Sequence, residues 1–88
     1  MSTQPEGLEG ELSFARVPQL LRHADSLAAD GVLDLGRVSR TDSAGLALLL
    51  ELERRGKASG KPLIIRGASK QIVDFAGFFG LDKILRFE

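Results

Sequence analysis

Short apolar runs alternate with segments of helical periodicity along this chain, and that alternation limits its fold more than any other feature. Residues 32–35 (VLDL) and 63–65 (LII) are apolar runs of strand length. Each is followed by a stretch in which apolar residues recur every three to four positions, as on one face of a helix. Strands that alternate with helices pair in parallel, and the helices pack on the sheet. The sequence therefore predicts an α/β fold with a mostly parallel sheet.

Four strands and three helices are expected in that fold. The predicted strands span 8–12, 32–35, 63–65 and 83–87, and the predicted helices span about 16–30, 43–58 and 69–79. Residues 8–12 contain Gly10 and are expected to form a short edge strand. Pro18 fits only the first turn of the first helix, which Gly31 ends. Residues 37–42 (RVSRTD) are expected to form a loop.

Composition predicts one domain, with a flexible segment over 1–7 and the folded domain over 8–88. The 12 basic and 12 acidic residues balance, so the chain lacks the charge that nucleic acid or anionic lipid would attract. There is no cysteine and one histidine, His23, so no metal site is expected. No signal sequence is visible, and no apolar run approaches the ~20 residues of a membrane span. We expect an intracellular protein that does not insert into the membrane.

The motifs of nucleotide binding and of nucleophilic catalysis are missing. The segment GRVSRTDSAG has neither Walker A nor G-x-G-x-x-G spacing. No serine lies in a G-x-S-x-G elbow, and there is no second histidine to act as a base. The sequence therefore predicts neither catalytic residues nor a cofactor.

The segment SRTDSAGLALLLEL, residues 39–52, opens the second predicted helix with polar residues and two small ones. On one interpretation Asp42 or Ser43 caps the helix, and the Ala44-Gly45 pair lets it approach the sheet closely. On the other, the Ser43 hydroxyl is exposed at the positive end of the helix dipole, where a partner or a phosphate could be accommodated. The carboxylate of Asp42 would oppose a phosphate by like-charge repulsion.

The leucines of this helix cover a wide part of its surface. They span roughly 200° at about 100° per residue, against the stripe of about 100° that a core-facing helix needs. The residues concerned are Leu46, Leu48, Leu49, Leu50 and Leu52. The excess either packs at the edge of the sheet or forms a docking face for another protein. A strip beside the core face, here called the Ser43 strip, consists of Ser43, Ala47, Leu50 and Arg54.

These residues resemble a known family. The segment VLDLGRVSRTDSAGLALLLEL is similar to the signature of STAS domains, the sulfate transporter and anti-sigma factor antagonist family, in which D-S-x-G-L opens a helix. FAGFFGLDKILRF is similar to the last helix and tail of that family, and GEL at residues 10–12 is similar to an early strand. Anti-sigma antagonists commonly have a second serine where this chain has Ala44. The form S-R-x-D-S-A-G-L-A-L-L-L-E looks most like the small cytoplasmic STAS subunit of the Mla phospholipid-transport complex. The first strand of the family has little room within residues 1–7.

The resemblance implies a non-enzymatic regulatory subunit, cytoplasmic and peripheral to the inner membrane. Its implied partner is an MlaF-like ATP-binding subunit of an ABC transporter, held in complex with an inner-membrane permease. Ser43 matches the hydroxyl residue at the ATPase contact. The contact residues expected on this basis are Arg40, Thr41, Asp42, Ser43, Ala44, Gly45, Ala47, Leu48 and Arg54. The alternative is an anti-sigma factor antagonist that is controlled by phosphorylation of Ser43.

Overall fold

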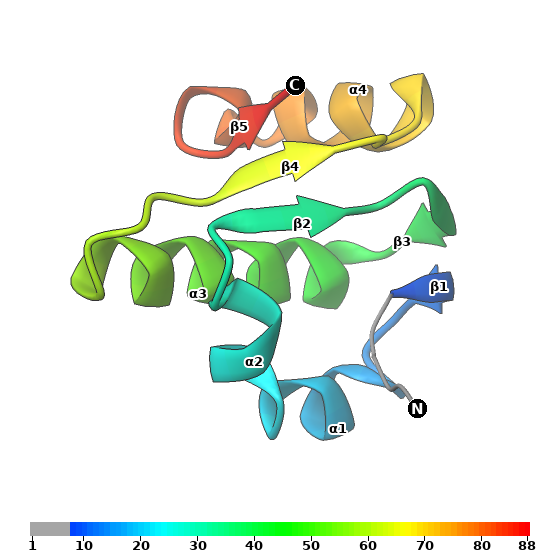
Figure 1. Cartoon of the computed structure of the whole chain (residues 1–88). Helices are drawn as coiled ribbons and strands as arrows, with labels where there is room; N and C mark the ends of the chain where they lie inside the picture. The colour runs from blue at the N-terminus through cyan, green and yellow to red at the C-terminus, as the bar shows by residue number, and fades with distance from the viewer. Residues whose placement is uncertain (1–7) are drawn as a thin grey trace.

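The computed structural model describes residues 8–88 as one α/β unit (Figure 1). The predicted flexible segment over 1–7 lies outside the described residues. The elements are β1 (Glu9–Leu12), α1 (Val17–Leu21), α2 (Ala24–Ala28), β2 (Val32–Asp34), β3 (Arg37–Thr41), α3 (Ser43–Ala58), β4 (Ile64–Arg66), α4 (Lys70–Phe78), the 3-10 turn η1 (Leu81–Lys83) and β5 (Arg86–Phe87).

All the strand pairs among the described residues are parallel. β1 pairs with β3, and β4 lies between β2 and β5 in a second group. The prediction of a parallel α/β fold is confirmed. The prediction of four strands was wrong, because residues 37–41, expected to form a loop, make the additional strand β3. Val38 is buried between exposed neighbours, as a residue on the inner face of a strand should be.

A bend between β2 and β3 explains why these residues resembled a loop. The Gly36 N–H donates to the Asp34 carboxylate at 2.7 Å, which forms a side-chain turn. The Leu35 N–H still donates to the Arg66 carbonyl beside β4, and the Val38 N–H then donates to the Leu35 carbonyl. The segment thus stops pairing with β4 and begins to pair with β1 within three residues.

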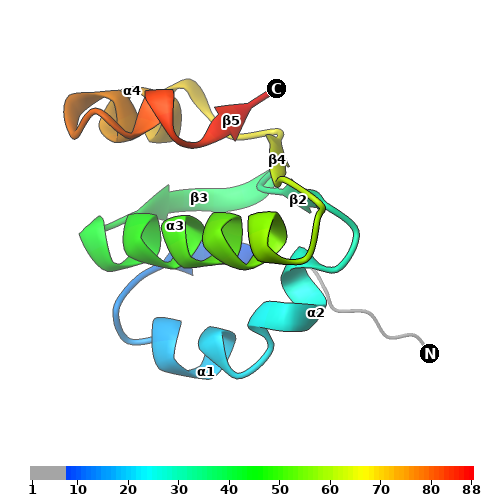
Figure 2. The same ribbon diagram turned by 90° about the vertical axis from the view of Figure 1, so that its left-hand side faces the viewer.

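The first helix is broken into α1 and α2. Pro18 lies in the first turn of α1, and Gly31 follows α2 with a φ of 74°, as predicted. The prediction of one continuous helix was wrong, because His23 adopts φ −110° and ψ 17°, outside the helical region. The break allows both short helices to pack on α3 (Figure 2). Ala24 and Ala28 of α2 are buried.

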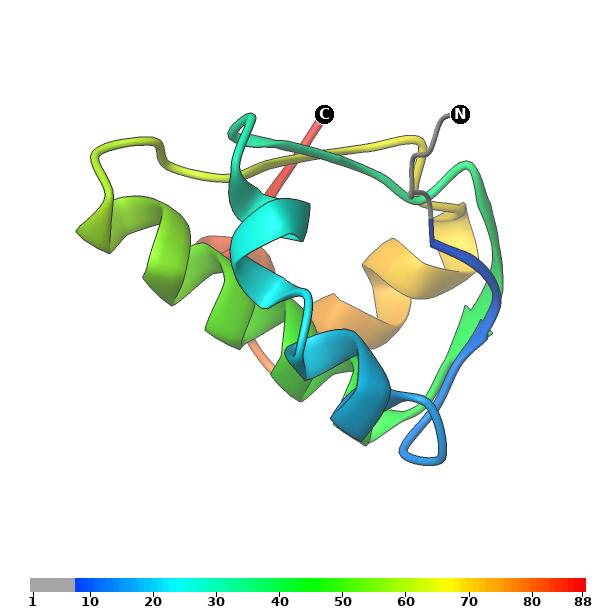
Figure 3. The ribbon, with the colours of Figure 1, turned by 60° about the horizontal axis from the view of Figure 1, so that its bottom comes forward.

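α3 has the predicted bounds and is the central helix of the core. α1 and α2 contact it from one side and β3 from another (Figures 2 and 3). Four of its leucines are no more than 2 % exposed, namely Leu46, Leu48, Leu49 and Leu52. A helix that is covered on two sides needs a wider apolar arc than one that rests on a single sheet. These four leucines are therefore core residues, and their interpretation as part of a docking face was wrong.

α4 begins and ends where the sequence predicts. The Ser69 hydroxyl accepts from the Ile72 N–H at 3.2 Å as the N-cap, and Gly80 follows the helix with a φ of 75°. Ile72 and Ala76 of the predicted core face are buried, whereas Phe79 is 50 % exposed. β5 forms within the predicted last strand.

Two polar side chains fix the ends of strands. The buried carboxylate of Glu53 on α3 accepts from the Leu63 N–H at 3.1 Å, just before β4. The Arg16 guanidinium donates to the carbonyl of Glu9 and, at 2.8 Å, to that of Glu11. The Leu12 carbonyl points the other way and accepts from the Asp42 N–H. Arg16 therefore lies along the side of β1 that faces away from β3.

Candidate functional site

The candidate site is built around the head of α3, residues 41–45. Asp42 is the N-cap, and its carboxylate accepts from the Gly45 N–H at 3.0 Å. Its second oxygen accepts from the Phe14 N–H, also at 3.0 Å. The hydrogen bonds from Gly45 and from Phe14 stabilise the ionised form, so the pKa of Asp42 lies below its usual range. Of the two capping residues that the sequence allowed, the structure uses Asp42.

The head of α3 is attached to the end of β1. The Thr41 hydroxyl donates to the Leu12 carbonyl at 3.0 Å, and the Asp42 N–H donates to the same oxygen at 3.1 Å. A Cβ atom at Gly45 would lie 2.5 Å from that carbonyl oxygen and 1.9 Å from Thr41 Oγ1. The close approach expected of this small residue is confirmed. Thr41, Asp42 and Gly45 act as the support of the site.

The Ser43 strip lies on the surface beside this support. Ser43, Ala47 and Arg54 are exposed, and Leu50 is half-buried. Ser43 is the first residue of α3, and within residues 8–88 its hydroxyl makes no hydrogen bond. The strip expected from the helical wheel is thus present as one free face of α3.

Two of the predicted contact residues are not on that face. Leu48 is 1 % exposed, and Gly45 is buried against the end of β1. Their inclusion among the contact residues was wrong, because a helical wheel does not show that α3 is covered on a second side. Ala44 is half-buried, and Arg40 is exposed with its Nε 3.3 Å from a carboxylate oxygen of Glu11.

Two features beside the head of α3 come from distant parts of the sequence. One is a hollow of about 610 Å³ between the end of β3 and α4, lined by Arg40, Thr41, Gln71, Ile72, Asp74 and Phe75. The other is the ring of Phe14, which is 73 % exposed although its N–H is held by Asp42. Phe14 lies outside the helical pattern of its neighbours, and that irregularity was the only signal of it in the sequence.

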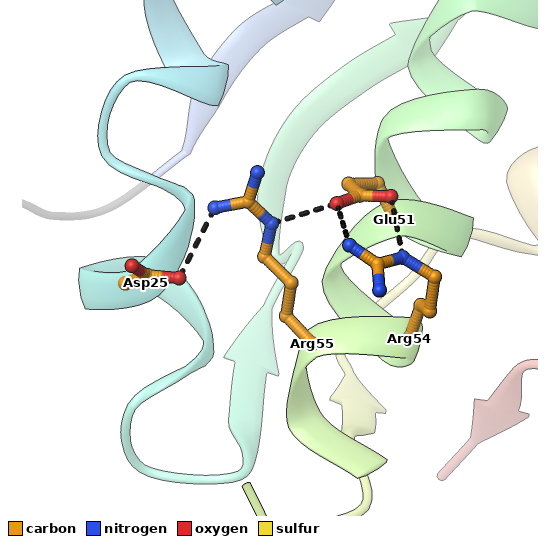
Figure 4. A network of polar contacts seen from close by, with 4 residues as sticks. All are labelled: Asp25, Glu51, Arg54 and Arg55. Carbon is orange, nitrogen blue, oxygen red and sulfur yellow. Dashed lines mark hydrogen bonds and ion pairs between the residues drawn. The ribbon is translucent and has the colours of Figure 1, made fainter. Parts of the chain in front are cut away.

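An ion-pair network ties the far end of the Ser43 strip to α2 (Figure 4). Arg54 donates to both oxygens of Glu51, at 3.0 and 2.7 Å, and Arg55 donates to Glu51 at 2.7 Å. Arg55 also donates to Asp25 on α2 at 3.1 Å. The hydrogen bonds from Arg54 and Arg55 lower the pKa of Glu51 to about 2. The charge of Arg54 on the Ser43 strip is therefore partly neutralised from within α3.

This network gives a prediction for the dependence of stability on pH. The pKa of Glu51 falls from 4.5 to about 2 on folding, so its contribution is complete above pH 4.5 and is lost as the pH falls toward 2. The difference in free energy of unfolding between the wild type and Glu51→Gln should therefore shrink over that range. Urea unfolding at a series of pH values measures it, and carbon-13 NMR of the Glu51 carboxyl group gives the pKa directly. Titration of that carboxyl near its ordinary value would contradict the network.

The described residues offer no grouping for a metal ion. Among residues 8–88, no three His, Asp or Glu side chains gather closely enough to hold one. No helix over the same residues has the length and apolar character to cross a membrane.

The fold and the capped head of α3 define a small parallel α/β domain, and comparison with known families gives its class. Residues 7–86 match the model of the family described as Mlab, STAS domain. The chain belongs to that family, which confirms the resemblance found in its sequence.

Curated relatives narrow the likeness to one branch. Over 49 residues the chain is 39% identical to the intermembrane phospholipid transport system binding protein MlaB of Escherichia coli K12. The identity to the protein of the same name from Shigella flexneri is the same. Each alignment covers 56% of this chain and 50% of the relative, so the chain spans about half the length of the curated relatives it matches.

Solved structures show the same fold at low sequence identity. A protein assigned as an anti-sigma factor antagonist from Thermotoga maritima superposes with a TM-score of 0.76 and 18% identity, covering 90% of this chain and 72% of that one. The unphosphorylated anti-sigma factor antagonist SpoIIAA gives a TM-score of 0.65 and 22% identity, covering 92% of this chain and 74% of that one. At such identities the likeness concerns the fold alone.

Proposed function

We propose that this chain is a regulatory subunit without catalytic activity that binds the ATP-binding subunit of a phospholipid ABC transporter. In this proposal it lies in the cytoplasm, at the inner membrane, through the complex of that ATPase with its permease. The observation that carries the proposal is the 39% identity to MlaB, a binding protein of an intermembrane phospholipid transport system. The proposed role is to stabilise or activate the ATPase.

The ATPase-binding face in this proposal consists of Arg40, Ser43, Ala47 and Arg54. All four side chains are exposed. Arg40 and Ser43 lie at the head of α3, and Ala47 and Arg54 follow along its free face. Ser43 and Ala47 are small and uncharged, so a partner surface can approach the helix closely there. Thr41 and Asp42 support the face through hydrogen bonds to the end of β1 and to the start of α3.

Substitutions at the two small residues should abolish or strongly weaken the complex. A charge placed in a closed protein interface without a partner costs several kcal/mol, so Ser43→Asp and Ala47→Arg should each reduce affinity for the ATPase at least tenfold. Co-purification and titration with the ATP-binding subunit measure the effect. Ser26→Asp and Ala29→Arg introduce the same charges at exposed positions outside the face and should bind as the wild type does. Undiminished binding by both face variants would refute the proposed face.

A second candidate function is an anti-sigma factor antagonist switched by phosphorylation of Ser43. The observation that favours it is the exposed Ser43 at the first position of α3, where the cap is supplied by Asp42 instead. A phosphate of about −1.5 to −2 charge would meet the helix dipole favourably and the Asp42 carboxylate unfavourably. Intact-mass measurement after incubation with ATP and an anti-sigma kinase separates the two functions. A phosphate adduct at Ser43 would favour this second one.

A further inference from the structure

We infer that Phe14 is the apolar anchor of the ATPase-binding face, an inference that rests on the function proposed above. The occupant in question is the ATP-binding subunit, which must offer an apolar pocket for an aromatic ring beside the contact for Ser43. The starting observation is the 73 % exposure of Phe14, because an isolated ring gains nothing from remaining in water.

The backbone around Phe14 is held on both sides. The Ser13 carbonyl accepts from the N–H groups of Arg16 and Val17, at 2.9 and 3.0 Å. The Leu12 carbonyl is bound by the head of α3, and the Phe14 N–H donates to the Asp42 carboxylate. The ring is therefore presented to solvent by a fixed turn. A partner that covers the ring has to order only its side-chain torsions, because the backbone is already fixed.

The same carboxylate connects Phe14 to the proposed face. Asp42 binds the Phe14 N–H with one oxygen and the Gly45 N–H with the other, and Ser43 follows it in the chain. Figures 2 and 3 both show the turn after β1 next to the start of α3. Phe14 therefore extends the face beyond Ser43 and continues it with an apolar group.

The chemistry of the combined surface favours a protein partner. Aromatic residues dominate the energetic centres of protein interfaces, where they fill pockets that exclude water. Ser43 and Ala47 on the adjoining face are small side chains, which leave room for the wall of such a pocket. Phe78 is still more exposed, at 83 %, but its ring lies 5.3 Å from that of Phe79 at the end of α4. It thus provides an internal control of equal size.

The test is a titration of the purified ATP-binding subunit with the wild type, Phe14→Ala, Phe78→Ala and Ala47→Arg. Circular dichroism and thermal unfolding check that each variant is folded. Removal of either exposed ring should leave the fold unchanged. We expect Phe14→Ala to weaken binding at least tenfold and Phe78→Ala to change it less than twofold. Wild-type affinity of Phe14→Ala, together with weak binding of Ala47→Arg, would overturn the anchor and leave the proposed function intact. Absence of binding by the wild type would overturn both, and a wild-type dimer that Phe14→Ala abolishes would identify a second copy as the occupant.

Discussion

Replacement of Gly45 by alanine should lower the free energy of unfolding by about 3 kcal/mol. The added Cβ would lie 2.5 Å from the Leu12 carbonyl oxygen and 1.9 Å from Thr41 Oγ1. The hydroxyl can rotate away, but the carbonyl belongs to the backbone of β1, so the helix and the strand must separate. Overpacking of this kind costs about 1–3 kcal/mol, and the hydrogen bonds of Leu12 with Thr41 and Asp42 would weaken in addition, at roughly 1 kcal/mol each. Urea unfolding measures the change.

Gly77 provides the matched control for this substitution. It lies on α4, is exposed, and a Cβ atom there would meet nothing nearer than the Asp82 carboxyl carbon at 3.9 Å. Alanine is a better helix former than glycine by up to about 1 kcal/mol, so Gly77→Ala should leave stability unchanged or raise it. An equal effect of the two substitutions would show that the head of α3 does not need its close approach to β1.

Replacement of Leu48 by alanine should cost about 3 kcal/mol of stability, as is typical of buried leucines. The side chain is 1 % exposed, so its loss removes apolar contacts and leaves a cavity that the neighbouring helices fill only in part. Urea unfolding of the purified variant gives the change in free energy.

Leu50→Ala is the control, since it makes the same change two positions along α3. Leu50 is half-buried, so its replacement should lower the free energy of unfolding by about 1 kcal/mol, mainly through the loss of the apolar surface that it buries. Equal losses of unfolding free energy at the two positions, or a loss below 1 kcal/mol at Leu48, would contradict the two-sided burial of α3. Leu48 would then have to be exposed.

Local signals in the sequence were sufficient for much of this fold. Asp42 caps α3, and Ser69 caps α4. Both helices begin where a polar residue precedes an apolar repeat, because capping involves only neighbouring residues. Residues 32–52, with the similar stretches at 10–12 and 75–87, identified the STAS family, and the family match confirms that identification.

The features that the sequence did not predict depend on contacts between distant segments. β3 forms because residues 37–41 pair with β1, and the polar letters RVSRTD do not reveal that partner. The break at His23 follows from the packing of two short helices on α3. The burial of Leu48 was not predicted for the same reason, since the sequence of one helix does not show which other elements cover it. The role of Asp42 in holding Phe14 likewise joins residues that are 28 positions apart.

The position of Arg16 affects whether copies of this chain can pair with one another through β1. Among residues 8–88, β1 pairs with β3 alone, and such an outer strand can recruit a strand from another molecule. Two of the carbonyls that an incoming strand would need, those of Glu9 and Glu11, are already occupied by the Arg16 guanidinium. An approaching chain must first displace a charged, hydrogen-bonded group. A single side chain thereby protects the short strand that supports the head of α3 from edge-to-edge aggregation.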